Sequence, residues 1–233
     1  MKNQPAVTQQ QWLKARRALL AKEKKFTRLR DELARQRQAL PWVRVEKDYV
    51  FEGAKGRRTL AQLFDGRSQL VIYHFMFGPD WNAGCPHCSH WADSFDRAPV
   101  HLAQRDVSFA AVSRAPYKKL AAYRKRMGWN FSWLSSAGSD FNFDFGASFT
   151  PQQLAEKKKV YNFGTLAPGV SEREGVSVFC RDKRGRIFHT YSTFARGIDA
   201  LSVDYQILDL TPKGRDEDGR GPYWVRRHDE YAS

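Results

Sequence analysis

The chain has 233 residues, of which 42% are hydrophobic and 14% aromatic, and it carries a formal net charge of +14 at pH 7. This apolar content is enough for a buried core and excludes a chain that is disordered throughout. No run of about 18 apolar residues occurs, which excludes a membrane-spanning helix. The opening MKNQPAVTQQQW contains no apolar segment, so we expect no secretory signal.

The first 40 residues predict one long amphipathic helix over 8–40. Its apolar side chains recur every seven residues: Trp12, Leu19, Phe26, Leu33 and Leu40. Lys22 and Gln36 interrupt the second apolar position of the heptad, which argues against a long coiled coil. We therefore favour a helix that packs on its own domain, with a homodimer through this helix as the alternative.

Basic residues are concentrated in the same segment. Residues 1–40 hold eleven Lys and Arg against three acidic residues. Such a face attracts nucleic acid or anionic lipid. However, the chain has no helix-turn-helix signature, no RNP-like aromatic motif and no zinc-finger spacing. We interpret the charge as a solvated helix face and expect neither a nucleic-acid nor a membrane partner.

Pro41 ends the helix, because its ring cannot continue the hydrogen-bond ladder. Residues 42–51 alternate apolar and charged side chains and predict a half-buried strand. Residues 69–77, QLVIYHFMF, have the composition of a central strand covered on both faces. A helix that opens at CPHC and a second apolar strand at 107–113 follow, which together predict a right-handed βαβ unit.

Further along, residues 117–127 predict another amphipathic helix, and the aromatic stretch after it predicts an ordered loop over a site. Residues 176–180 and 186–191 predict a β-hairpin turned at Gly185. We expect residues 213–222 to be mobile. The resulting division has an N-terminal helical arm (1–41), an α/β domain (42–210) and a C-terminal tail (211–233).

Cys85 and Cys88 form a CxxC motif at the start of the helix that follows the buried strand, a setting typical of a thioredoxin-like redox site. The N–H groups and dipole of a helix N-terminus favour a thiolate at Cys85, and a charged His87 favours it further. Pro86 fits the first helical turn without losing a hydrogen bond. Cys85 is then the attacking thiol, and Cys88, one turn inside and shielded by Trp91, resolves the mixed disulfide.

The number of cysteines indicates a reducing compartment. Three is an odd count and argues against the disulfide framework of a secreted protein. We therefore expect a cytoplasmic protein with one working dithiol and no cofactor. Cys180 stands alone in an apolar strand and should be buried and inert.

Two other interpretations of the dithiol remain open. Cys85, Cys88 and His90 could hold a metal, although no second cysteine pair completes a tetrahedral set. Alternatively, the thiols only pack in the core and the protein serves as an interaction scaffold.

Neighbouring residues supply candidates for the remaining roles. His74, inside the central strand, and His189, on the hairpin, are expected to be core histidines with a hydrogen-bond partner. The candidates for a substrate groove are Pro86, Asp80, Trp81 and Trp91.

The segment YHFMFGPDWNAGCPHCSHWADSFD (73–96) resembles a bacterial family known as domain of unknown function 899. So do VSRAPYKKLAAYRKRMGW, SDFNFDFGASF, FHTYSTFARGID and, near the two ends, KEKKFTRLRDELARQR and WVRRHDEY, so the likeness covers nearly the whole chain. Members of that family are labelled predicted dithiol–disulfide oxidoreductases with a thioredoxin-like fold. The resemblance therefore implies an α/β thioredoxin-like domain with an N-terminal helical arm, and its activity label rests on fold analogy.

The CPHC sequence is also similar to the active site of the periplasmic oxidase DsbA, which implies that Cys85 attacks and Cys88 resolves. Two positions depart from thioredoxins. Thioredoxins carry a cis-proline before the strand that follows the βαβ unit, whereas 174–177 contains no proline. Gly84 replaces the aromatic residue that precedes their first cysteine.

The layout resembles peroxiredoxins as well. Those enzymes carry Thr or Ser three residues before the peroxidatic cysteine, where this chain has Asn82. We therefore rank a peroxidase below thiol–disulfide exchange with a protein, or with a small-molecule thiol or disulfide.

Overall fold

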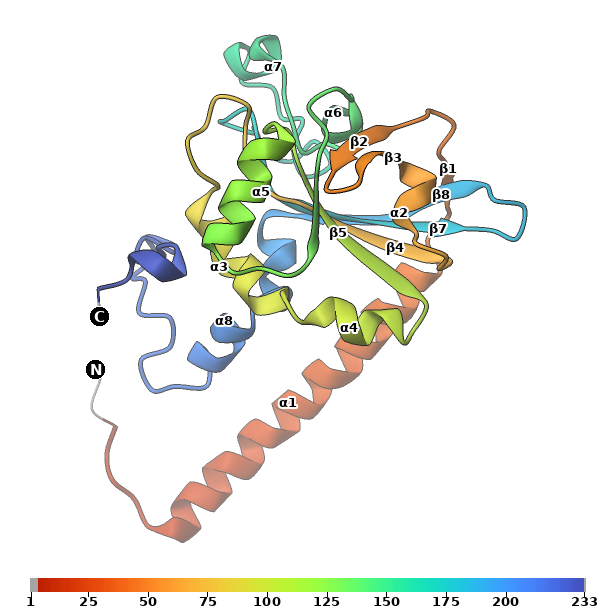
Figure 1. Ribbon diagram of the computed structural model, residues 1–233. Coiled ribbons are helices and arrows are strands. Elements are labelled where there is room, and N and C mark those ends of the chain that lie inside the picture. Colours follow the sequence, from red (N-terminus) through yellow and green to blue (C-terminus); the bar gives the residue numbers. More distant parts are fainter. Residues whose placement is uncertain (1–3, 233) are drawn as a thin grey trace.

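An eight-stranded mixed sheet lies at the centre of the fold in the computed structural model, which describes residues 4–232 (Figure 1). Its strands are β1 (Val43–Arg44), β2 (Val50–Gly53), β3 (Gly56–Thr59), β4 (Gln69–His74), β5 (Val107–Ser113), β6 (Ser132–Ser135), β7 (Gly175–Arg181) and β8 (Ile187–Phe194). They lie in the order β1-β8-β7-β4-β5-β6-β2-β3. The first three residues of the predicted arm (1–41) and the last residue of the predicted tail (211–233) lie outside the described residues.

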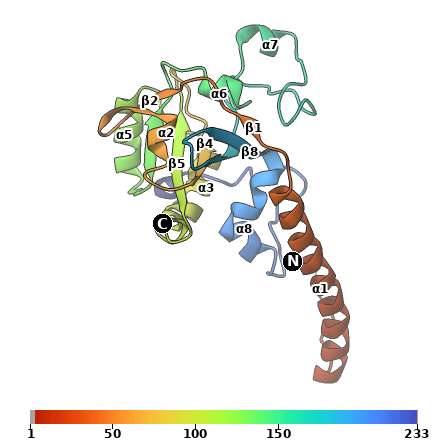
Figure 2. The same ribbon diagram turned by 90° about the vertical axis from the view of Figure 1, so that its right-hand side faces the viewer.

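Helices flank this sheet, except for the N-terminal helix, which extends away from it (Figures 1 and 2). They are α1 (Gln9–Gln38), α2 (Leu60–Leu63), α3 (Pro86–Phe95), α4 (Ala98–Ala103), α5 (Tyr117–Arg126), α6 (Phe141–Asp144), α7 (Pro151–Ala155) and α8 (Val203–Leu208), with short 3-10 helices η1 (Ala195–Leu201) and η2 (His228–Glu230). Among the described residues, no helix combines the length and the apolar character needed to cross a membrane.

β4, α3 and β5 form the predicted βαβ unit. β4 pairs parallel with β5, from Gln69 opposite Val107 to His74 opposite Val112, and antiparallel with β7. β7 in turn pairs antiparallel with β8. A βαβ unit whose first strand also borders an antiparallel hairpin is the thioredoxin-like arrangement, so the predicted fold class is confirmed.

Side chains of β4 enter two different cores, which explains its continuous apolar sequence. Leu70 and Ile72 pack in the cluster that contains Phe51. Tyr73 packs in the cluster that contains Cys88. Burying one such side chain stabilises the fold by about 1.5–3 kcal/mol. The helix of the dithiol is thereby fastened to the sheet through Cys88 itself.

Two elements are shorter than their sequence pattern predicts. Residues 42–51 do not form one strand, because β1 pairs with β8 at one edge of the sheet whereas β2 pairs with β3 and β6 at the opposite end. The helix that opens at the cysteines ends at Phe95, and α4 starts afresh, because Pro99 is tolerated only in the first turn of a helix.

α1 begins at a capping box on Thr8 and confirms the predicted arm, but the expected packing on its own domain is wrong. Both views show α1 pointing away from the sheet (Figures 1 and 2). None of its residues is buried, and Phe26 is 61% exposed. The chain passes from α1 into β1, the edge strand of the sheet, so the helix leaves the domain at its border. A homodimer through this helix stays a prediction.

The C-terminal tail folds back onto the domain. Arg215 forms ion pairs with Asp199 (2.8 Å) and Asp209 (2.7 Å). The Tyr205 hydroxyl of α8 donates to the Glu217 carboxylate at 2.9 Å. The stretch expected to be mobile is therefore bonded to the domain, through charged partners that the local sequence pattern does not reveal.

Candidate functional site

Cys85 is the N-cap residue of α3, and the loop that leaves β4 places it there. Its backbone N–H donates to the Met76 carbonyl at 3.0 Å. Pro86 occupies the first helical turn, where its missing N–H costs no hydrogen bond. A Cβ at Gly84 would come within 2.7 Å of the Phe75 ring, so only glycine fits before the first cysteine. The Cys85 sulfur thus lies at the positive end of the helix dipole.

The two cysteines of the motif are both free thiols with different surroundings. Cys85 is half-buried, whereas Cys88 is fully buried. The Met76 N–H donates to the Cys88 sulfur at 3.4 Å. Cys85 is therefore the thiol that a partner reaches first.

Acidities of the two thiols are pushed in opposite directions. The hydrogen bond from Cys88 lowers the pKa of Cys85 well below its usual range, and a hydrogen bond from His87 lowers it further, against the effect of burial. Burial raises the pKa of Cys88 well above its ordinary value, and the Cys85 sulfur adds to that rise. The hydrogen bond to Cys85 raises the pKa of His87. The pair thus favours a thiolate on Cys85 and a proton on Cys88.

Cys85 and Cys88 are both among the residues that line a cavity of about 340 Å³. Glu174 lines it too, because Gly175, the first residue of β7, pairs with His74 at the end of β4 and brings the preceding residue to the dithiol. Burial raises the pKa of the Glu174 carboxyl. The cavity therefore joins a thiolate, a thiol and a carboxyl group that takes up a proton more readily than an exposed one.

The predicted groove residues divide into two groups. Trp91 lines the cavity, and its indole N–H is buried without a hydrogen-bond partner among residues 4–232. Pro86 starts the helix beside the cavity without lining it. Asp80 is exposed and Trp81 half-buried in the loop before α3, and neither lines the cavity. The structure thus brings only Trp91 of the four to the same space as the sulfurs.

His90, the third ligand of the metal alternative, lines the same cavity as the two cysteines, but its ring is engaged by the C-terminal part of the chain. Its Nε2 contacts the Asp204 carboxylate, and its ring lies edge-on to Trp224 at 5.7 Å. Within the described part of the chain, no group of three or more His, Cys, Asp or Glu is arranged to hold a metal ion. A metal site at the dithiol would need a rearrangement of His90.

The other singled-out residues have structural surroundings. His74 is buried, as expected, and bonded to the Ser177 hydroxyl at 2.8 Å, and burial lowers its pKa to about 3. His189 is half-buried and bonded to the Ser192 hydroxyl at 2.7 Å. Cys180 is half-buried, not buried as expected, because it lies near the end of the β7–β8 hairpin; burial still raises its pKa.

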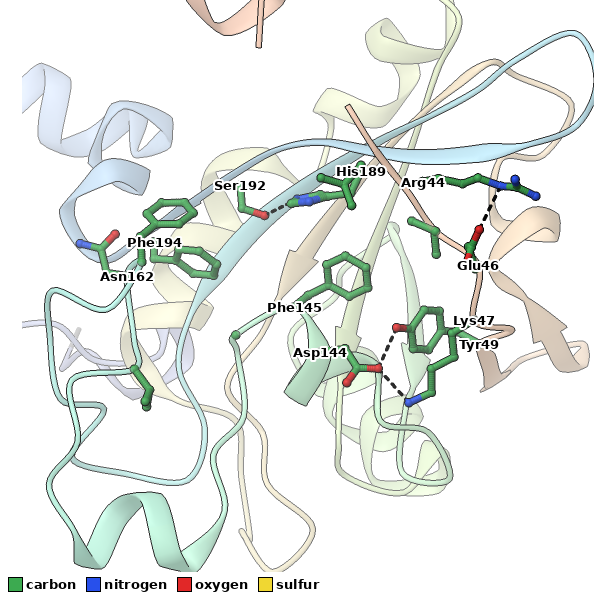
Figure 3. Close-up of a pocket in the computed structure, with 15 residues that line it drawn as sticks. Arg44, Glu46, Lys47, Tyr49, Asp144, Phe145, Asn162, His189, Ser192 and Phe194 are labelled. Carbon is green, nitrogen blue, oxygen red and sulfur yellow. Dashed lines mark hydrogen bonds and ion pairs between the residues drawn. The ribbon is translucent and has the colours of Figure 1, made fainter. Parts of the chain in front are cut away.

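A second hollow of about 440 Å³ lies beside β8 (Figure 3). There the Asp144 carboxylate accepts hydrogen bonds from Lys47 (2.9 Å) and from the Tyr49 hydroxyl (2.7 Å). His189 points to Ser192 in the same view. The polar side chains of this hollow bond to one another.

The family model of a bacterial protein of unknown function, DUF899, matches residues 1–231. The chain belongs to this family. A search of curated proteins found no match.

Several solved structures resemble this DUF899 chain. Peroxidoxin BcpB from Mycobacterium tuberculosis is 17% identical, with 71% of this chain and 91% of that chain covered and a TM-score of 0.47. For peroxiredoxin Q from Xanthomonas campestris the values are 14%, 68%, 89% and 0.46. For a thiol:disulfide interchange protein DsbE from Chlorobium tepidum they are 12%, 72%, 96% and 0.42. At these values, the function is argued from the site itself.

Sequence reasoning missed several residues at the dithiol of this DUF899 chain. Glu174 belongs to the stretch noted only for its missing proline, and its carboxyl group lines the cavity. Pro222 and Arg227 come from the tail and contact the residues around Cys85. The likeness of the WVRRHDEY segment to the family was a signal that this segment matters, although it did not indicate where it lies.

Proposed function

We propose that the protein is a thiol–disulfide oxidoreductase in which Cys85 attacks and Cys88 resolves. The observation that carries this proposal is the opposite shift in acidity of two thiols at one helix N-terminus. A packing role gives no use for a thiolate, and a metal role needs a third ligand at the dithiol. The substrate is a protein, or a small-molecule thiol or disulfide.

The reaction proceeds in two exchanges. The Cys85 thiolate attacks one sulfur of a substrate disulfide, the substrate S–S bond breaks, and one substrate thiolate leaves and takes a proton from solvent. Cys88 then loses its proton and attacks the Cys85 sulfur, which releases the second substrate thiolate and forms the Cys85–Cys88 disulfide. The substrate gains two electrons and the protein loses them. The same steps in reverse oxidise a substrate dithiol.

Glu174 is the group we assign to the second exchange. Cys88 is buried and must lose a proton before it attacks. The Glu174 carboxylate shares the cavity with both sulfurs and is placed to accept that proton. Tyr73, whose pKa is raised by burial, lies beside Cys88 and donates to the sulfur once it is charged. Glu174 thus accepts the Cys88 proton, and Tyr73 stabilises the resulting thiolate before it attacks Cys85.

The cysteines also bear on the cellular compartment that we propose for the protein. An odd number of cysteines, all of them free thiols, suits a reducing environment, and we propose the cytoplasm.

A trapping experiment tests the order of attack. Cys88→Ser protein incubated with glutathione disulfide should accumulate a glutathione adduct on Cys85, because the second exchange is blocked. Cys85→Ser protein should accumulate few adducts, since Cys88 is buried. Mass spectrometry of the intact variants counts the adducts. Equal adduct formation by both variants, or none by either, contradicts the proposal.

A further inference from the structure

The C-terminal strap, defined here as residues 221–228, contacts Gly84 and His87, the residues on either side of Cys85-Pro86. The His87 Nε2 is 3.1 Å from the Pro222 carbonyl oxygen. The Arg227 guanidinium donates twice to the Gly84 carbonyl, at 2.7 Å from Nη2 and 3.1 Å from Nε. Cys85 lies between these two contact points in the sequence. The segment is found beside α3 at the blue end of the chain (Figure 1).

The strap is anchored by contacts that involve neither Gly84 nor His87. Val225 is 3% exposed and packs into the domain. His228 Nδ1 contacts the Asp93 carboxylate at 2.8 Å. Directly after the strap, Asp229 forms an ion pair with Arg126 of α5 at 2.7 Å. The position of the strap is therefore set independently of the groups it touches at the dithiol.

The contact with Pro222 determines how His87 acts. A carbonyl oxygen only accepts, so Nε2 must carry the proton in this hydrogen bond. Nδ1 is then left to accept the proton of the Cys85 thiol. After the transfer, both ring nitrogens carry protons, one bonded to the carbonyl and one facing the thiolate. Cys85, His87 and the Pro222 carbonyl thus have the general arrangement of an activated nucleophile, its base and a third group that orients the base.

His87 shares its cavity with charged side chains of the loop before β7, of η1 and of the tail, namely Arg173, Glu174, Arg196, Asp199 and Arg215. The Cys85 thiolate, from the same helix turn, raises the pKa of His87 through their hydrogen bond, and the Pro222 carbonyl raises it as well. The Glu174 carboxyl acts in the same direction from the loop before β7.

We propose that the C-terminal strap is a working part of the dithiol site: Pro222 positions His87, Arg227 positions the loop before Cys85, and together they set the reactivity of the Cys85 thiolate. This inference rests on the proposed function. Pro222 and Arg227 are positioning residues, because they act on Cys85 through His87 and Gly84.

The test undocks the strap in the full chain. Val225→Asp places a charge in a buried position and should release the strap, whereas Val203→Asp makes the same change at a site that is 53% exposed. The rate of Cys85 alkylation by iodoacetamide is followed by mass spectrometry from pH 4 to pH 9. At pH 6 we expect Val225→Asp and His87→Ala each to slow alkylation about tenfold, because the thiolate loses a charged partner. Val203→Asp should match the wild type.

A double variant shows whether the strap acts through His87. In the His87→Ala background, Val225→Asp should slow alkylation by no more than about threefold, the share expected from Arg227, because the group that Pro222 positions is already gone. An alkylation profile of Val225→Asp that superimposes on the wild type overturns the inference. So does a faster rate at every pH with an unchanged midpoint, since the strap would then only cover the thiol.

Arg227→Gln provides a second route that leaves the buried core intact. It removes the bonds to Gly84 and should slow alkylation about threefold. Its control is Arg226→Gln, whose side chain, among residues 4–232, bonds only to the strap carbonyls of Tyr223 and Val225. Equal rates for these two variants overturn the role of Arg227. A wild-type protein that forms no Cys85–Cys88 disulfide instead refutes the proposed function, whatever the alkylation profiles show.

Discussion

Two hollows of this protein contain ionisable side chains, and the larger one is not the better candidate for chemistry. In the second hollow, about 440 Å³, Asp144 is matched by Lys47 and Tyr49, and His189 by Ser192. In the dithiol cavity, about 340 Å³, neighbouring thiols have pKa values displaced in opposite directions. The volume of a hollow therefore does not show whether it is a reactive site. What distinguishes the dithiol cavity is an uneven sharing of protons among groups in contact.

The largest expected difference between the two hollows is in the exchange rate. Cys85→Ser should lower the rate at which the reduced protein reduces glutathione disulfide by roughly a thousandfold or more, because it removes the attacking thiolate. His189→Ala, in the second hollow, should leave that rate within about twofold. Initial rates for the two purified variants check this. A comparable loss in both variants would mean that the second hollow takes part in the reaction.

Glu174 sharpens the comparison within the dithiol cavity. Glu174→Gln should slow the second exchange by roughly a hundredfold and flatten its pH dependence, since an amide does not accept the Cys88 proton. Glu172→Gln is the matched control: this neighbouring carboxyl is also buried, but it pairs with Arg114 and does not line the cavity. Release of glutathione from a preformed Cys85 mixed disulfide measures the step. Equal slowing by both substitutions would assign the effect to stability.

His74, which is linked by hydrogen bonds to His189 of the second hollow, makes the stability of the fold depend on pH. His74 bonds to Ser177, which bonds to Ser192 and so to His189. Burial lowers the pKa of His74 to about 3, below the value of about 6.5 in an unfolded chain. As pH falls below about 6.5 the unfolded state gains a proton that the folded state does not, so stability is lost between about pH 6.5 and pH 3.

At pH 5 this loss amounts to about 2 kcal/mol for one group. Urea unfolding at pH 8 and pH 5 should show the full decrease in the wild type and in His101→Gln, an exposed position on α4, and a decrease smaller by about that amount in His74→Gln. The same decrease in all three proteins would show that His74 is not its source.

Much of the fold follows from local sequence patterns. The strand at 107–113 and the hairpin turned at Gly185 appear where they are predicted, because alternation, apolar runs and glycine turns are recorded within a few residues. The CxxC at a helix N-terminus is likewise a local pattern. The alternation over 42–51 misled because it does not show that its two halves pair with different strands at opposite ends of the sheet.

What sequence patterns did not reveal depends on contacts between distant residues. Gly84 and Arg227 are 143 positions apart, and His87 and Pro222 are 135 apart. No periodicity within either segment encodes such a contact. The prediction that α1 packs on its own domain failed for a related reason. An apolar stripe shows that a helix has an apolar face, but it does not show what covers that face.

The central claim, a redox-active pair with a stabilised thiolate at Cys85, is tested most directly by a redox titration. The protein is equilibrated with glutathione buffers of graded potential, free thiols are trapped with an alkylating reagent, and the state of Cys85 and Cys88 is read by mass spectrometry. We predict one two-electron transition to an intramolecular Cys85–Cys88 disulfide, at a potential less negative than the value of about −270 mV known for thioredoxin, because a stabilised thiolate favours the reduced form. Two free thiols across the whole range would contradict the account.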